Sequence, residues 1–220
     1  MRYSAVIFDL DGTLIDSEPM FNAVAKIAAR EFDKCFTDEL YLDLVGLPGS
    51  EVESGILDAF GQSFPMADFR NAFAMHWEKH VSEHGIAVKT GVLDLVDQLD
   101  ELCVPYAIAT STPHERALQS LQFAGLANRF RYVIGGDQIE HGKPAPDIYL
   151  EAAKTITTEP ACCIAIEDSK VGVRSAAAAK MYTIMIPDIK PPDAHTRTLA
   201  TEIIPSMDLA ITRVLNLLGR

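Results

Sequence analysis

Short apolar segments recur along most of this chain, and the residues between them have their apolar side chains at helical spacing. We predict strands at YSAVIF, RYVI, VPYAIAT, CCIAI and YTIMI, which occupy residues 3–8, 131–134, 104–110, 162–166 and 182–186. Near-continuous apolar strands that alternate with helices are typical of a parallel sheet covered on both faces. The sequence therefore predicts an α/β fold with a doubly wound parallel sheet.

A helical stretch interrupts this alternation directly after the first strand. Apolar residues recur there at helical spacing, and no strand pattern lies between them. Ser17 is expected to cap the first helix, and Ser50 with Glu53 matches a capping box for the third. The four predicted helices span residues 17–32, 37–46, 50–61 and 65–85.

The length of 220 residues suits one domain that carries an inserted module. We predict an α/β core built from residues 1–16 and 87–220, with an all-helical domain, residues 17–86, inserted after the first strand. Residues 203–218 are expected to add an edge strand and a final helix. The polar, proline-bearing segment 191–205 fits either a loop or an interface.

The chain is strongly acidic, with 31 Asp and Glu against 19 Lys and Arg and a formal net charge of -12. Such a surface repels nucleic acid and anionic membranes, so we expect neither as a partner. The N-terminal segment has the pattern of neither a signal peptide nor a membrane helix. The spacing of the cysteines indicates buried free thiols in a reducing compartment rather than a zinc site; they are Cys35, Cys103, Cys162 and Cys163. We expect a cytoplasmic monomer.

Two aspartates stand close together where the first strand ends. Asp9 and Asp11 face the same way on an extended segment, and Gly12 allows the chain to turn sharply after them. Like charges at this spacing disfavour joint ionisation. A cation or a chemical role is therefore expected beside them.

Other polar residues follow the later strands. Thr110 and Ser111 follow one strand, Glu167 and Asp168 follow another, and Lys143 precedes a helix. Each alone also fits a helix cap, a strand end or a surface lysine. Because ligands of such sheets bind beyond the carboxyl ends of the strands, the combination predicts one shared site.

Phosphoryl chemistry fits this set of side chains. Mg²⁺ prefers carboxylate and carbonyl oxygens, and Thr110, Lys143 and the amides near Ser111 suit phosphate oxygens. The helix that starts near residues 112–113 is expected to add its positive end. Asp9 would attack phosphorus, and Asp11 would protonate the leaving oxygen and then activate water.

Four segments, in order along the chain, resemble the four motifs of the haloacid dehalogenase superfamily. They are DLDGT at 9–13, Thr110, GKPAPD at 142–147 and IEDS at 166–169. The resemblance implies an Mg²⁺-dependent phosphatase that forms an aspartyl phosphate. It also implies that Asp9, the backbone of Asp11, and Asp168 ligate the metal, with Glu167 supporting it, and that the helical insert is a cap domain.

DSEP at 16–19 and VGLPGSE at 45–51 resemble the branch of sugar-phosphate phosphatases and β-phosphoglucomutases. The mutases carry a histidine and an arginine in the cap where this chain has Phe21 and Gly49. This difference favours hydrolysis of a small phosphorylated metabolite, with mutase activity and a non-catalytic phosphate-binding module as alternatives. Phe21, Gly46 and Leu47 are predicted to contact the substrate. A dehalogenase is disfavoured because halide leaves without a proton, and Asp11 would then have no task.

Overall fold

The computed structural model describes residues 3–47 and 49–219 of the protein. It divides into two compact units. The α/β unit is formed by Met1–Asp16 together with Ala87–Arg220, and the helical unit is formed by Ser17–Ile86.

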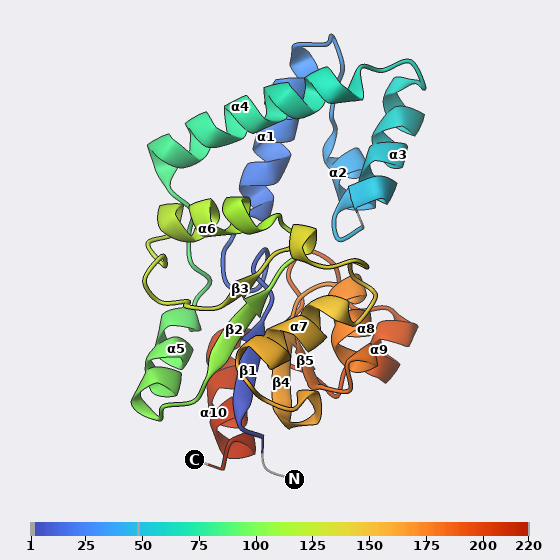
Figure 1. The fold of residues 1–220 in the computed structure, drawn as a ribbon. Helices are drawn as coiled ribbons and strands as arrows, with labels where there is room; N and C mark the ends of the chain where they lie inside the picture. The colour runs from blue at the N-terminus through green and yellow to red at the C-terminus, as the bar shows by residue number, and fades with distance from the viewer. Residues whose placement is uncertain (1–2, 48, 220) are drawn as a thin grey trace. The chain divides into compact units, whose positions relative to one another are not determined.

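A single parallel sheet organises the α/β unit (Figure 1). Among the described residues it has six strands in the order β3-β2-β1-β4-β5-β6, which confirms the predicted doubly wound fold. The central strand pairs on both sides, since Ile7 is in register with Ala107 and with Ala165. The strands are β1 Ala5–Phe8, β2 Tyr106–Ala109, β3 Val133–Ile134, β4 Cys163–Glu167, β5 Tyr182–Met185 and β6 Glu202–Ile203.

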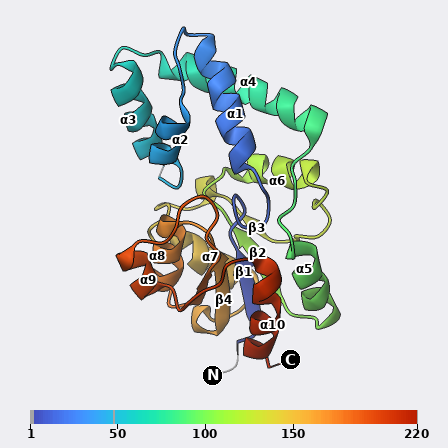
Figure 2. The same ribbon diagram turned by 180° about the vertical axis from the view of Figure 1, so that it is seen from behind.

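Helices cover both faces of this sheet, as Figures 1 and 2 show from opposite sides. α7 and α8 lie on one face, and α5 and α10 lie on the other. Alternate strand residues such as Ile7 and Ala165 pack in one cluster with Tyr149 of α7. Every residue of β1 and β4 is buried, so both faces of these central strands are covered. The helices are α5 Val92–Glu101, α6 His114–Phe123, α7 Asp147–Thr155, α8 Lys170–Ala178, α9 Ala194–Leu199 and α10 Met207–Leu217, with short 3-10 turns at Gly136–Gln138 and Pro160–Cys162.

The helical unit contains α1 Glu18–Arg30, α2 Asp38–Leu44, α3 Gly49–Phe60 and α4 Met66–His84. Aromatic rings fill its interior. The ring of Phe64 lies 4.9 Å from that of Phe60 and 5.5 Å from those of Phe32 and Phe69, measured between centroids. Such tilted and edge-to-face pairs stabilise a core beyond the area that they bury.

Two predicted helix starts differ from the structure. Ser17 stands before α1 in a helical backbone conformation, and its side chain makes no capping bond. α3 begins at Gly49, one residue before the predicted start, and the Glu53 carboxylate accepts a bond from Arg70 at 2.6 Å. The Ser50 side chain of the predicted capping box lies outside what the structure describes. Pro19 in the first turn of α1 provides the start signal that Ser17 was expected to provide.

The segment 191–205 is more ordered than a loop, because it contains α9 and β6. Asp193 caps α9 by accepting a bond from the Thr196 amide at 2.8 Å. This N-cap was present in the sequence and was missed because prolines surround it.

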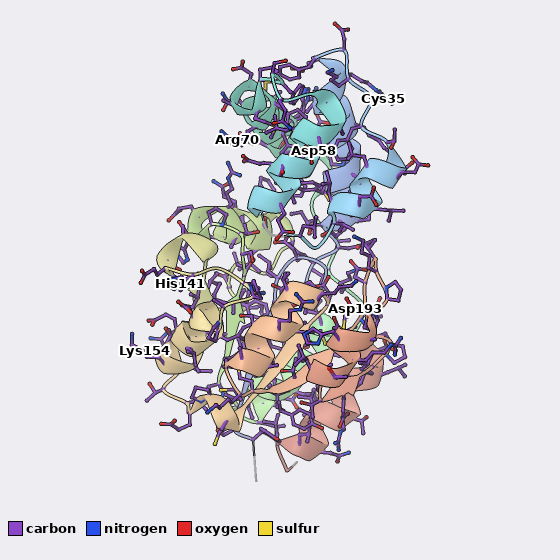
Figure 3. All side chains as sticks on the ribbon, turned by 90° about the vertical axis from the view of Figure 1, so that its right-hand side faces the viewer. Cys35, Asp58, Arg70, His141, Lys154 and Asp193 are labelled. Atoms are coloured by element: carbon purple, nitrogen blue, oxygen red, sulfur yellow. The ribbon has the colours of Figure 1, made fainter. Side chains whose placement is uncertain are left out.

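The cysteines are free thiols, as predicted, but only Cys163 is buried. Cys35 and Cys103 are exposed, and Figure 3 labels Cys35 between α1 and α2. Within the part of the chain that the structure describes, no helix has both the length and the apolar character needed to cross a membrane.

Candidate active site

The site begins where β1 and β4 end side by side. The Asp9 amide donates to the carbonyl of Ile166 at 2.9 Å, so the ladder between the two strands continues to Asp9. This brings Asp9 next to Glu167, the last residue of β4. The strand order reverses at β1, which is where open α/β sheets bind their ligands.

A buried lysine joins the two strand ends. The Nζ atom of Lys143 lies 2.6 Å from Oδ1 of Asp9 and 2.5 Å from Oε1 of Glu167. The three side chains are only 3%, 10% and 0% exposed. Burial alone lowers the pKa of the Lys143 ammonium, but the charges of Asp9 and Glu167 outweigh this and raise it above its usual value. One ammonium is therefore shared by two carboxylates.

Both oxygens of Glu167 are occupied by protein donors. Oε1 also accepts the Tyr149 hydroxyl at 2.8 Å, and Oε2 accepts the Ser169 hydroxyl at 3.0 Å. The amides of Asp168 and Ser169 lie 3.2 Å from the same Oε2 atom. These bonds fix the position of the Glu167 carboxylate beside Lys143.

Gly172 on α8 makes room for that carboxylate. A Cβ atom added at Gly172 would lie 1.8 Å from Oε1 of Glu167, far inside van der Waals contact. The Glu167 carboxylate therefore occupies the volume that any other residue's side chain would need.

Asp168 completes a cluster of three carboxylates. Each of Asp9, Glu167 and Asp168 offers an oxygen, and these oxygens lie within 4.8 Å of one another. Burial raises the pKa of Asp9 to about 8 despite the opposing effect of Lys143, and burial and the charge of Asp9 raise the pKa of Asp168 well above its usual value. The protein alone leaves negative charge in excess here, so the donor set fits a hard divalent cation held by Asp9 and Asp168.

Asp11 stands apart from this cluster. Its Oδ2 atom accepts the Thr112 hydroxyl at 2.7 Å. The Thr112 amide in turn donates to the hydroxyl oxygen of Thr110 at 3.1 Å, so the segment after β2 folds back toward the end of β1. Thr110 is almost fully buried, and the neighbouring Ser111 is exposed.

α6 begins at His114, next to the predicted start near residues 112–113. The first helical amide, that of His114, donates to the Asp137 carboxylate at 2.7 Å. One donor expected to face a phosphate is therefore already bonded within the protein. The amides of Ser111 and Thr112 precede the helix, and Thr112 too uses its amide within the loop.

The remaining predicted site residues lie in the helical unit. Phe21 on α1 and Leu47 after α2 are both 38% exposed. The Phe21 ring lies 4.7 Å from that of Phe73, and Gly46 adopts a positive φ of 77°. Exposed apolar side chains at these positions are compatible with a substrate contact, which stays a prediction.

Sequence reasoning missed several residues that support the site. Thr112 donates a hydrogen bond to Asp11, and Tyr149 donates one to Glu167. Gly172 leaves space for the Glu167 carboxylate. In the sequence, Tyr149 occupies one more apolar position of a helix, so nothing there indicates its hydrogen bond. Ser169 was included in a motif, but its bond to Glu167 depends on the turn after β4.

Comparisons with known proteins agree with this geometry. Residues 6–186 match the haloacid dehalogenase-like hydrolase family. The chain is 32% identical over 181 residues to a phosphorylated carbohydrates phosphatase of Thermotoga maritima, covering 82% of this chain and 83% of the relative. It is 29% identical over 191 residues to the fructose-1-phosphate phosphatase YqaB of Escherichia coli, covering 83% and 96%. The chain belongs to the haloacid dehalogenase-like hydrolases.

The fold alone is shared more widely. The crystal structure of a β-phosphoglucomutase from Clostridium difficile superposes with a TM-score of 0.80 at 18% identity, covering 99% of this chain and 97% of the other. A protein named as a mutase therefore shares this architecture, and the fold alone does not choose between a phosphatase and a mutase.

Proposed function

We propose that this protein is an Mg²⁺-dependent phosphatase that hydrolyses a small phosphomonoester, a sugar phosphate or a similar metabolite. The observation that carries the proposal is the buried cluster of Asp9, Lys143, Glu167 and Asp168 at the carboxyl ends of the sheet. The names of the two phosphatase relatives support the substrate class.

Asp9 is the nucleophile in this proposal. One carboxylate oxygen attacks phosphorus, the bond from phosphorus to the ester oxygen breaks, and an aspartyl phosphate forms. Asp11 gives its proton to the departing oxygen, which leaves as an alcohol. Water then attacks the phosphorus of the aspartyl phosphate, Asp11 takes its proton, and inorganic phosphate leaves with Asp9 restored.

Other residues hold the transferring group. Lys143 places a positive charge beside Asp9, and the Thr110 hydroxyl with the Ser111 backbone offers donors to the phosphoryl oxygens. Thr112 keeps Asp11 oriented through its 2.7 Å bond. Mg²⁺ held by Asp9, Asp168 and the Asp11 carbonyl would neutralise the charge of the phosphoryl oxygens, which is where much of the catalysis of phosphoryl transfer lies.

The helical unit, residues 17–86, is proposed to act as the cap that excludes water and selects the leaving group. Phe21, Gly46 and Leu47 would contact the substrate. The chain has Phe21 and Gly49 where the mutases carry a histidine and an arginine, which supports transfer of the phosphoryl group to water rather than to a second sugar.

The test is phosphate release from a panel of sugar phosphates and other small phosphomonoesters, with Mg²⁺ and with chelator. Asp9→Asn is expected to lower the rate by roughly 10⁴-fold or more, because it removes the nucleophile. Asp97→Asn is the matched control, since Asp97 pairs with Arg129 on the surface, and it should retain the activity.

Glucose 1-phosphate is followed in the same assay for conversion to glucose 6-phosphate. Conversion without phosphate release would replace the phosphatase with a mutase. Binding of phosphate analogues without turnover of any substrate would leave a binding module instead.

A further inference from the structure

Asp188, just after β5, lies beside the carboxylate cluster of Asp9, Glu167 and Asp168. Its Oδ1 atom is bonded within the protein and is 2.5 Å from Nζ of Lys89, which also lies 3.0 Å from Oδ1 of Asp16. Asp16 and Lys89 are themselves fixed by backbone bonds, from the Asp16 amide to Ala87 and from the Lys89 amide to Leu14. The Asp188 carboxylate is therefore held in one orientation.

The second oxygen of Asp188 is buried and accepts no hydrogen bond from the described residues. This oxygen faces the carboxylate cluster, and Gly12 lies beside the space between them. A Cβ atom placed on Gly12 would lie 2.5 Å from Oδ2 of Asp168 and 3.3 Å from Oδ2 of Asp188. A buried carboxylate oxygen without a donor is costly, so a donor is expected in this space.

The distances argue against Asp188 as a direct ligand. The oxygens that lie within 4.8 Å of one another come from Asp9, Glu167 and Asp168 only, among the residues described. Mg²⁺ keeps several water molecules when one or two carboxylates bind it, and those waters are strong donors. Residues that accept from the coordination sphere orient the ligands and tune affinity.

We propose that Asp188 is a positioning residue for the metal site, whose Oδ2 atom accepts a hydrogen bond from a water molecule bound to Mg²⁺. This rests on the proposed function, because it requires Mg²⁺ at Asp9 and Asp168. Lys89 occupies Oδ1 and leaves Oδ2 directed at the cluster.

The experiment is Mg²⁺ titration of the whole protein by calorimetry, without substrate. Asp188→Asn is expected to weaken Mg²⁺ binding by about 10–100-fold, as loss of an outer-shell partner typically does. Asp16→Asn is the matched control, because it makes the same charge change and also removes an ion pair with Lys89. It should bind Mg²⁺ within about twofold of the unchanged protein if outer-shell contact is what matters.

Lys89→Met separates this role from a structural one. It breaks the ion pair that orients Asp188 but keeps the carboxylate itself, so Mg²⁺ binding should weaken less than in Asp188→Asn. Equal weakening in Lys89→Met and Asp188→Asn would mean that only the ion pair matters, and would overturn the proposal. So would Asp188→Asn with unchanged affinity and only a lower melting temperature.

Two further outcomes keep the inference separate from the proposed function. Unchanged Mg²⁺ affinity in Asp188→Asn, together with Mg²⁺-dependent phosphate release, overturns the role of Asp188 and keeps the phosphatase. Absence of Mg²⁺ binding by the unchanged protein overturns both. Asp188→Ser is the second variant should Asp188→Asn not fold, and the same loss of affinity is expected from it.

Discussion

The two units of this protein differ in where their paired charged side chains lie. The α/β unit buries an ammonium and two carboxylates in one network, Lys143 with Asp9 and Glu167. The helical unit keeps its ion pairs outside, such as Arg70 with Glu53, whose side chains are 56% and 43% exposed, and fills its interior with aromatic rings. Exposed pairs contribute little to stability, whereas a buried network is strongly destabilising when one partner is lost.

This difference indicates how each unit can change. The buried network has a fixed set of partners, so a substitution there should damage stability and activity together. An apolar interior accepts other side chains of similar volume, and the exposed face of the helical unit can vary without affecting the charges.

The largest expected effect comes from breaking the buried network at its centre. Lys143→Met leaves Asp9 and Glu167 facing each other without a counter-ion, and should lower the free energy of unfolding by about 3–5 kcal/mol in metal-free protein. It should also abolish phosphate release. Urea unfolding and the phosphate assay measure the two effects.

Lys154→Met is the matched control for Lys143→Met. The Lys154 side chain is 76% exposed, points away from α7 in Figure 3 and pairs with Glu151. Its removal should change stability by less than about 1 kcal/mol. Similar losses in the two variants would contradict the contrast between buried and exposed charges.

The pH dependence of stability tests the excess of negative charge. Burial raises the pKa of Asp9 from 3.8 to about 8, so the folded state holds a proton that the unfolded state has released. The contribution of Asp9 to stability is therefore complete below pH 3.8 and is lost as the pH rises toward 8.

Asp9→Asn removes this titration. In chelator, the free energy of unfolding of Asp9→Asn minus that of the unchanged protein should increase from about pH 5 to about pH 8. Urea unfolding at both values measures the difference. A difference that does not depend on pH would show that Lys143 keeps Asp9 ionised in the folded state, and that the pKa of Asp9 is not raised.

A pair of glycine substitutions gives the smallest expected effects and the sharpest comparison of the two units. Gly172→Ala pushes a Cβ atom into the Glu167 carboxylate, which four neighbours hold in place, and should cost about 1–3 kcal/mol with loss of activity. Gly55→Ala meets only the end of the Leu44 side chain, 2.3 Å away. Because Leu44 can turn aside and alanine favours the helix, its stability should stay within about 1 kcal/mol of the starting value.

Thermal melting and phosphate release compare the two variants directly. Both changes add one methyl group to a helix, so intrinsic helix propensity cancels between them. Equal losses of stability and activity in the two variants would mean that the Glu167 carboxylate can move away from the added methyl group. That would contradict a rigid Glu167 network.

Much of the α/β unit was predictable because its signals are local. Strand β1 and its two aspartates follow from an apolar run that ends in Asp9 and Asp11, and the helices of the insert follow from apolar spacing. Helix starts were less predictable: Ser17 has the right chemistry for a cap, yet its backbone already has a helical conformation. The conformation that decides whether a serine caps depends on the preceding loop.

The sequence by itself determined which groups stand at the ends of the strands, since a parallel sheet brings the carboxyl ends of distant segments to one edge. Only the tertiary structure decided which of these groups touch. That Tyr149 donates to Glu167, that Gly172 leaves space for this carboxylate, and that one oxygen of Asp188 faces Asp168 without a donor depend on how helices and loops pack against the sheet. The positions of the strands along the chain are set by short-range patterns, whereas contacts over a few ångströms between distant residues depend on the whole packed core.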